Sequence, residues 1–180
     1  EKFGAHRVEL IHAFTDGGLS PCLELSREVC EALTIPVNVM VRPHANSFIY
    51  DYKDMHKINS EIDYLASKTK ASAIVFGALN LANSIDYRQL ESVLGLLDSS
   101  HLGLTFHRAI DVANDVVSEF MELQNYAGTS LQRVLSSGGA DTALNGVSNL
   151  AAMQRLIKPS GGVKLLAGSG VKPINVVELL

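Results

Sequence analysis

The sequence predicts an α/β protein whose parallel sheet is built from repeated strand–helix units. Six short apolar segments recur about every 30 residues, and nearly all of them end in a charged residue, serine or glycine. Their centres are Val8, Val39, Val75, Leu104, Val134 and Leu165. Segments with helical periodicity separate them, which is the pattern of parallel strands joined by crossover helices.

The first half of the chain supplies three of these strands. They are residues 6–11, 35–42 and 71–79. The helix after the first strand is expected to begin with Ser20 as N-cap and Pro21 at the first helical position. Its apolar stripe is Cys22, Leu25, Val29 and Ala32. A second helix is predicted over about 54–68.

The second half continues the alternation. One strand is predicted to begin at 102 and to end in a polar segment at 105–111. Two more strands are predicted at 131–135 and at 163–167. Helical patterns cover 86–97 and 143–157, an apolar helical face is formed by Val116, Phe120 and Leu123, and a final helix begins near Pro173. The count is six strands and about six helices, with tight Gly/Ser loops at two of the strand ends.

Six units of this kind make most of a TIM-type (β/α)8 barrel, which normally needs about 250 residues. The chain has 180 residues, so we expect an incomplete barrel with about six βα units, forming a single domain over 1–180. An open six-stranded sheet is the alternative. In both architectures the C-terminal ends of the strands form one face, and ligand groups gather there.

Composition excludes several classes of partner. A net charge of −4 with scattered lysines offers no basic face, so we expect no nucleic acid and no anionic membrane as partner. No apolar run approaches the ~20 residues that span a bilayer. Two cysteines make no disulfide framework, which favours a cytoplasmic protein. Cys22 and Cys30 lie too far apart on one helix to share an ion, and we expect buried structural thiols.

The strongest chemical signal is the segment in which an apolar strand runs into His107, Arg108 and Asp111. At a strand C-terminus, a histidine can act as general acid or base. The neighbouring arginine can hold a carboxylate or phosphate with two parallel hydrogen bonds. A structural network of ion pairs that closes the top of the barrel explains the same residues, and both interpretations remain open.

Glu9 and Arg42 extend this set of candidate residues. They lie at comparable heights on neighbouring predicted strands. A glutamate inside an apolar strand is costly to bury without a partner, so we expect an ion pair with Arg42 or with Arg7. That pairing alone would satisfy both side chains.

Two Gly/Ser loops that end neighbouring strands are candidate anion sites. Their residues are Ser137, Gly138 and Gly139 in one loop and Gly168, Ser169 and Gly170 in the other. Backbone N–H groups of such loops, at the start of a helix, bind phosphate and other anions. Tight turns between strands and helices need glycine as well, so a purely structural role is the alternative.

No set of metal ligands can be assigned from the histidines. They show no spacing typical of a metal site. His12 and His44 lie in loops at the expected barrel mouth, and either could join a site there.

Several segments together resemble the CutC family of copper homeostasis proteins. They are residues 5–10, 17–21, 35–37, 40–43, 48–50, 75–79, 85–86, 105–109, 133–135, 137–139 and 168–171, with Asp111 and Asn175. Their order and spacing hold across essentially the whole chain. The resemblance implies a (β/α)8 barrel of which the first strand, and everything after the helix of the seventh strand, are missing here.

The resemblance also implies a cytoplasmic protein that binds or delivers Cu(I). Two departures bear on that function. Ile11 stands where the family commonly carries a cysteine, and the family's Arg-Pro-Arg-Gly-Gly-Asp loop appears as the sequence of residues 42–47. A copper site carried over from the family therefore lacks its thiolates.

Three functions remain as hypotheses. The first is copper homeostasis with Cu(I) as ligand. The second is an enzyme acting on a small anionic substrate, with His107 as acid or base, Arg42 and Arg108 holding the anion, and Asp111 or Glu9 orienting them. The third is an oligomerising scaffold with a vestigial site, which the altered loop at residues 42–47 favours. Separately, an incomplete barrel exposes two strand edges that invite pairing with another copy.

Overall fold

The structure is a computed structural model that describes residues 4–179, and it contains one curled, parallel, six-stranded sheet. The strands are β1 (Val8–Leu10), β2 (Val37–Met40), β3 (Ala73–Phe76), β4 (Gly103–Phe106), β5 (Leu131–Ser136) and β6 (Lys164–Ala167). They pair in the order β1-β2-β3-β4-β5-β6, so each strand neighbours the next one along the chain. This confirms the predicted α/β fold with six strand–helix units.

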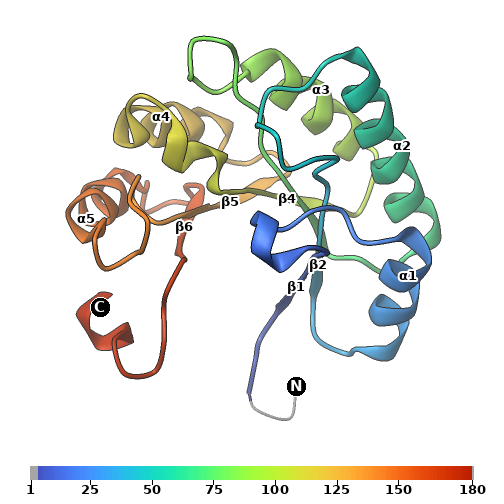
Figure 1. Ribbon diagram of the computed structural model, residues 1–180, viewed down its shortest axis with the longest axis horizontal. Coiled ribbons are helices and arrows are strands. Elements are labelled where there is room, and N and C mark those ends of the chain that lie inside the picture. The colour runs from blue at the N-terminus through green and yellow to red at the C-terminus, as the bar shows by residue number, and fades with distance from the viewer. Residues whose placement is uncertain (1–3, 180) are drawn as a thin grey trace.

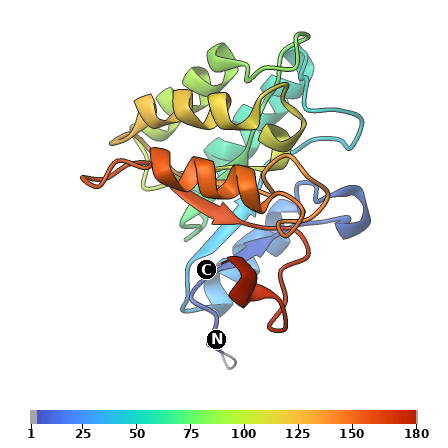
Figure 2. The same cartoon turned by 90° about the vertical axis from the view of Figure 1, so that its left-hand side faces the viewer.

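Five helices lie along the convex side of the sheet and leave its concave side uncovered (Figure 1). They are α1 (Leu23–Ala32), α2 (Tyr52–Lys68), α3 (Tyr87–Leu97), α4 (Val116–Leu123) and α5 (Val147–Leu156). Short 3₁₀ turns occur at Phe14–Asp16, Arg108–Val112, Gln124–Tyr126 and Val176–Leu179. The arrangement is that of a half-barrel, seen from its side in Figure 2.

The two faces of each strand have different roles, because side chains alternate along a strand. On β2, Val37 and Val39 belong to the hydrophobic core beneath the helices. Asn38 lies on the opposite, concave face, where its amide reaches the Thr105 hydroxyl across the sheet at 3.5 Å. The concave side therefore carries polar groups, and the convex side carries the main core.

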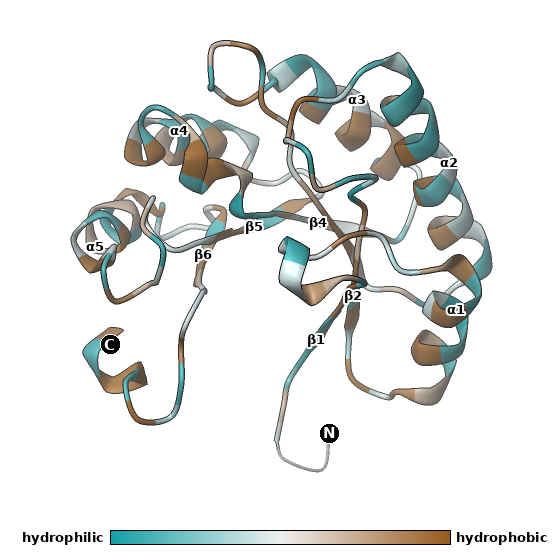
Figure 3. Ribbon diagram, viewed as in Figure 1, coloured by the Kyte–Doolittle hydropathy of each residue, from teal (hydrophilic) through white to brown (hydrophobic). Residues whose placement is uncertain are grey.

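The core between sheet and helices is closely filled. Phe76, Phe106 and Phe120 are among its largest fully buried side chains. The helices turn their apolar faces to the sheet and their polar faces outward (Figure 3). Asp51, Asp86 and Asp115 cap the N-termini of α2, α3 and α4 by accepting backbone N–H groups. These caps fix where each helix begins.

The first helix differs from its sequence-based prediction. Helix α1 begins at Leu23, and its N-cap is Cys22, whose sulfur accepts the Leu25 N–H at 3.4 Å. Ser20 instead donates to Glu61 and accepts the Arg42 N–H, so it joins β2 to α2. The prediction of Ser20 as N-cap was wrong because these tertiary partners occupy its hydroxyl.

The predicted apolar stripe of α1 is only partly buried. Leu25 and Ala32 are exposed and Val29 is half-buried, while Ser26 and Cys30 face the core. Helix α1 covers the β1 end of the sheet, where only α2 packs beside it (Figure 1). The expectation of a buried thiol is confirmed for Cys30 and wrong for Cys22, which is exposed as a cap.

Two predicted elements are shorter than expected. Strand β4 ends at Phe106, and the residues after it form a 3₁₀ turn at Arg108–Val112, capped by His107. The helix expected near Pro173 is a 3₁₀ turn at Val176–Leu179. The first of these differences matters for chemistry, because the turn redirects the side chains that follow β4.

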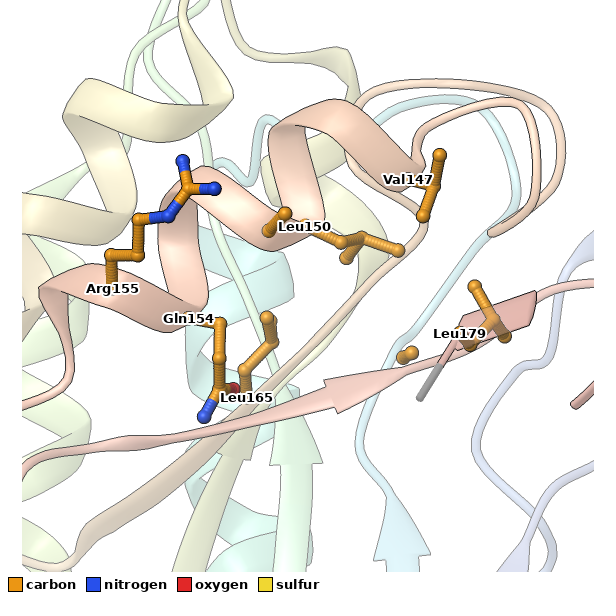
Figure 4. A pocket seen from close by; sticks show the side chains of 8 residues that line it. Val147, Leu150, Gln154, Arg155, Leu165 and Leu179 are labelled. Carbon is orange, nitrogen blue, oxygen red and sulfur yellow. The ribbon is translucent and has the colours of Figure 1, made fainter. Parts of the chain in front are cut away.

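A cavity of about 530 Å³ lies outside the sheet, between α5 and β6. Val147, Leu150, Leu165 and Leu179 line it with apolar side chains (Figure 4). It is remote from the concave face, and no acidic side chain or histidine is among the residues that line it. It therefore offers little chemistry compared with the polar end of the sheet.

Both ends of the described sheet are open, since neither β1 nor β6 has a partner on its outer side. Unpaired strands recruit strands from other molecules. We predict that the 180-residue chain associates or is of low stability, measured by sedimentation at rising protein concentration and by thermal unfolding. A monomer with one sharp and reversible transition would contradict this.

Candidate functional site

A cavity of about 270 Å³ opens at the C-terminal ends of the strands, on the concave side. Its wall combines residues from β1, β2 and β5 with others from the segments after β1, β2, β4 and β6. They include Glu9, Met40, Arg42, Phe48, His107, Arg108, Ser169 and Gly170. This is the face where parallel α/β proteins bind ligands. The structure thus brings most of the sequence-predicted candidates into one place.

Arg42 is the most buried charge in the wall, with 6% of its surface exposed. Its Nη1 donates to the carbonyls of Asp16 and Gly18 at 3.0 and 3.2 Å, and its Nη2 to the Ala45 carbonyl at 3.5 Å. The Nε–H group has no partner. Within residues 4–179, no carboxylate forms an ion pair with this guanidinium.

Phe48 packs between Arg42 and His107. The Arg42 guanidinium carbon lies 4.5 Å from the centre of the phenyl ring, and the ring centres of Phe48 and His107 are 5.0 Å apart. Such cation–π contact stabilises a buried guanidinium without neutralising its charge. The stack holds the positive group and the imidazole side by side.

His107 is held in one tautomer. Its Nδ1 accepts the N–H of Ala109 at 3.2 Å, which makes it the cap of the 3₁₀ turn after β4. The ring is 3% exposed, and its Nε2 has no partner in the described chain. Since a neutral imidazole carries one proton, and Nδ1 is an acceptor, that proton is on Nε2.

The charge state of His107 follows from its surroundings. Burial, together with the nearby positive charge of Arg42, lowers the pKa of His107 to about 3. The imidazole is therefore neutral at physiological pH and presents a single N–H donor. It is poorly suited to accept a proton there, in contrast to the acid–base role considered from sequence.

Gly77 makes room for this ring. A Cβ at Gly77 would lie 2.7 Å from His107 Nδ1 and 2.9 Å from its Cε1. No side chain fits at that distance, so a glycine directly after β3 is a requirement of the His107 position. The sequence signal for this contact was the single glycine that interrupts an otherwise apolar segment.

Glu9 lines the same cavity from β1, on the concave side. Protein atoms surround its carboxyl group on the inner side, while the open edge of the sheet leaves the residue accessible to solvent. The resulting partial burial raises the pKa of Glu9 above its ordinary value. The expected ion pair with Arg42 or Arg7 is absent among the described residues, because Arg42 turns to backbone carbonyls.

Arg108 and Asp111 form a closed network of their own. Arg108 Nε donates to Asp111 Oδ2 at 2.8 Å, and its Nη2 reaches the Ser137 hydroxyl at 2.8 Å and the Ala140 carbonyl at 3.2 Å. The 3₁₀ turn brings the two side chains together across three residues. This geometry matches the structural alternative considered for the pair.

Asp111 also binds the loop that follows β5. Its carboxylate accepts the backbone N–H of Ser137 at 3.0 Å, that of Gly139 at 3.2 Å, and the Ser136 hydroxyl. The N–H of Gly138 donates to Ser136 Oγ at 2.8 Å. The donors proposed for an external anion in residues 137–139 are thus already satisfied, those of Ser137 and Gly139 by the Asp111 carboxylate and that of Gly138 by the Ser136 hydroxyl.

The second Gly/Ser loop contributes Ser169 and Gly170 to the cavity wall. The Ser169 hydroxyl donates to the Asp141 carbonyl at 2.7 Å, and Gly168 N–H donates to the Ser136 carbonyl at 2.9 Å. Both Ser169 and Gly170 have positive φ, at 74° and 71°. This loop remains open toward the cavity, whereas the loop after β5 is filled.

The remaining candidates have local partners. His44 Nε2 lies 3.2 Å from Asp54 Oδ2, beside α2. His12 pairs through its backbone with Leu19 and closes the turn that carries residues 13–18. Within the described chain, no three His, Cys, Asp or Glu side chains are grouped to hold a metal ion. None of residues 4–179 lies in a helix long and apolar enough to cross a bilayer.

Sequence reasoning missed the apolar part of the wall. Phe14, Met40, Phe48 and Leu135 all face the cavity, yet none was proposed as a site residue. Met40 and Leu135 each stand next to a core residue in their strands, and neighbouring side chains of a strand point to opposite faces. This alternation is the sequence signal that places them on the concave face. Phe14 and Phe48 lie in loops, whose approach to the site depends on tertiary structure.

The comparisons with known proteins agree with the fold and the motifs. The sequence model of the CutC family matches residues 1–180. This chain belongs to the CutC family. A CutC family protein from Xylella fastidiosa is 34% identical over 176 residues, which are 98% of this chain and 63% of that protein. The chain therefore spans less than two thirds of that relative.

Other relatives carry related names. A Drosophila melanogaster protein named copper homeostasis protein cutC homolog is 35% identical over 182 residues, covering 100% of this chain and 66% of that protein. A crystal structure of CutC from Streptococcus agalactiae superimposes with a TM-score of 0.87 at 24% identity, covering 99% of this chain and 85% of that one. That likeness supports the fold of the CutC family.

Removing the Asp111 carboxylate should destabilise the protein. Asp111→Ala leaves two backbone N–H groups and the Arg108 guanidinium without their acceptor, and we expect a loss of ~2–4 kcal/mol in the free energy of unfolding. Urea denaturation measures it. Asp63→Ala, at an exposed position on α2, is the control, and an equal effect in both variants would contradict the assigned role.

The low pKa of His107 predicts a pH dependence of stability. Between pH ~6.5 and ~3 the unfolded chain binds a proton at His107 that the folded protein does not, so stability falls as pH decreases in that range, by up to ~1.4 kcal/mol per unit. Urea denaturation of the wild type and of His107→Gln isolates this contribution. The exposed His101→Gln variant should keep the wild-type slope, and an unchanged slope in His107→Gln would refute the burial argument.

Proposed function

We propose that the chain binds a small molecule with a carboxylate or phosphate group at the mouth of the half-barrel. The observation that carries this proposal is the Arg42 guanidinium, which is buried in the cavity wall and has no acidic partner among the described residues. A buried charge without a counter-charge is costly, and an anionic ligand removes that cost.

The donor count of Arg42 supports the same conclusion. A guanidinium has five N–H donors, and three of those of Arg42 reach backbone carbonyls. The Nε–H group is without an acceptor, and one N–H of Nη2 is left over. A guanidinium with two such donors can bind both oxygens of a carboxylate or phosphate, and the Tyr50 hydroxyl is the polar side-chain group that lies beside it in the described chain.

His107 supplies a third donor beside them. Its Nε2–H is buried, has no acceptor in the described chain, and belongs to a neutral ring that stays neutral at physiological pH. An oxygen anion accepts a hydrogen bond from such an N–H group, whereas a metal ion needs the nitrogen lone pair that the proton occupies. The tautomer fixed by Ala109 therefore favours an anion over a cation as the occupant.

Binding of Cu(I) is the second candidate, because the family relationship points to copper homeostasis. Met40 contributes a thioether to the same cavity wall as His107, and thioether and imidazole groups are copper ligands. For His107 to join Met40 on an ion, its Nε2 must give up the proton and the Ala109 contact must change. We place Cu(I) after the anion for this reason.

A catalytic role remains compatible with an anionic ligand. Arg42 and His107 would hold and polarise an oxygen-bearing group, and Arg108 would stay bound to Asp111. Glu9, whose pKa is raised, is then a better proton donor or acceptor than His107 near neutral pH.

We place the protein in the cytoplasm, since Cys22 and Cys30 are free thiols, as in reducing compartments.

Calorimetric titration with inorganic phosphate and with acetate tests the proposal. Arg42→Lys keeps the charge but loses the fork, and His107→Gln alters the third donor, so we expect each to weaken binding about 10- to 100-fold, equivalent to ~1.5–3 kcal/mol. Arg27→Gln, which removes a surface ion pair with Glu31, is the matched control. If neither phosphate nor acetate binds to the wild type, the proposal is overturned.

A parallel titration separates the two candidates. Cu(I) is added in competition with a chelator to the wild type, to His107→Ala and to Met40→Leu. Tight binding that both variants lose, without any anion effect, would favour the copper site. Phosphate or acetate binding that survives Met40→Leu supports the anion site.

A further inference from the structure

We infer that the ligand of this cavity carries a flat aromatic body attached to a single anionic group, with the ring lying against Phe14. The inference rests on the proposed function, because the anion end is the Arg42–His107 pair. It adds the chemical class of the rest of the ligand. Phe14, the 3₁₀ turn that carries it and the charge pattern of the cavity support it.

Phe14 is an aromatic side chain at the edge of a cavity with nothing packed on it. It lines the cavity, yet 85% of its surface is exposed. No aromatic ring of the described chain contacts the Phe14 ring, whereas Phe48 deeper in the wall is packed on both sides. Exposed aromatic surface beside a pocket is typical of a ligand contact, since stacking there removes apolar area from water.

The turn that carries Phe14 is positioned by the anion-binding group itself. Arg42 Nη1 holds the carbonyls of Asp16 and Gly18, on either side of the turn's end. The backbone hydrogen bonds between His12 and Leu19, at 2.9 and 2.7 Å, close the base of the same loop. The ring and the charge are therefore linked through one guanidinium, which fixes their separation.

The lining of the cavity fits an amphipathic ligand. Ile11, Met40 and Leu135 join Phe14 and Phe48 as apolar side chains of the same cavity wall. The volume of about 270 Å³ exceeds what a bare phosphate or acetate fills, so such an ion would leave apolar wall in contact with water. An aromatic ring attached to the anion covers that wall.

Glu9 limits the number of anionic groups. It is the one carboxylate among the residues that line the cavity. In its ionised form it repels a second negative charge on the ligand, and in its protonated form it donates a hydrogen bond to a neutral polar group. The cavity thus favours one negative charge near Arg42 and an uncharged remainder.

Paired ligands test this inference. Phenyl phosphate is compared with inorganic phosphate, and benzoate with acetate, by calorimetric titration of the full 180-residue chain. We expect the aromatic member of each pair to bind about 10-fold more tightly, equivalent to ~1.4 kcal/mol. In Phe14→Ala the preference should fall to about 2-fold or less, and Phe14→Leu should retain part of it.

Leu81→Ala is the matched control, because Leu81 is 90% exposed, lies outside this cavity and should leave the preference unchanged. Thermal unfolding of each variant verifies that it is folded. Equal binding within each pair, or a preference that Phe14→Ala does not change, would overturn the aromatic ligand while leaving the anion site intact. Failure of all four anions to bind would overturn the proposed function instead.

Discussion

The part of the cavity that is formed by β1, β2 and the loops after them depends on the buried guanidinium of Arg42. Arg42 follows β2, holds the loop after β1 through two carbonyls, and stacks on Phe48, which in turn packs against His107. Its charge also helps to keep that imidazole neutral. Because all its acceptors in the described chain are neutral carbonyls, the group organises the site and still retains a positive field for a ligand.

The positive charges on the two sides of the cavity mouth, those of Arg108 and Arg42, differ in whether a carboxylate of the described chain neutralises them. Near β4 and β5, the carboxylate of Asp111 neutralises Arg108 and fills the N–H groups of the loop at 137–139. Near β1 and β2, the cation has no such partner in the described chain. The internal carboxylate takes up N–H groups of a Gly/Ser loop that could otherwise hold an external anion, so the charge that stays without a carboxylate in the described chain lies on the β2 side.

Periodicity and motif order were sufficient to predict the alternation of strands and helices and the gathering of Arg42 and His107 at one end of the sheet. Contacts made across many residues could not be read from the sequence. Ser20 looked like a helix cap, but its hydroxyl is used by Glu61 and by the Arg42 N–H. Likewise, the tautomer of His107 depends on the turn that follows β4, which replaced the predicted extension of the strand.

The contacts between Arg42 and the turn at residues 14–16 use main-chain oxygens, so they are indifferent to which side chains the turn carries. Position 14 is largely solvent-exposed and can accept many residue types without disturbing the fold. A single substitution at position 14 can therefore change the shape and polarity of the cavity rim while Arg42 and the main-chain contacts that hold the turn stay as they are.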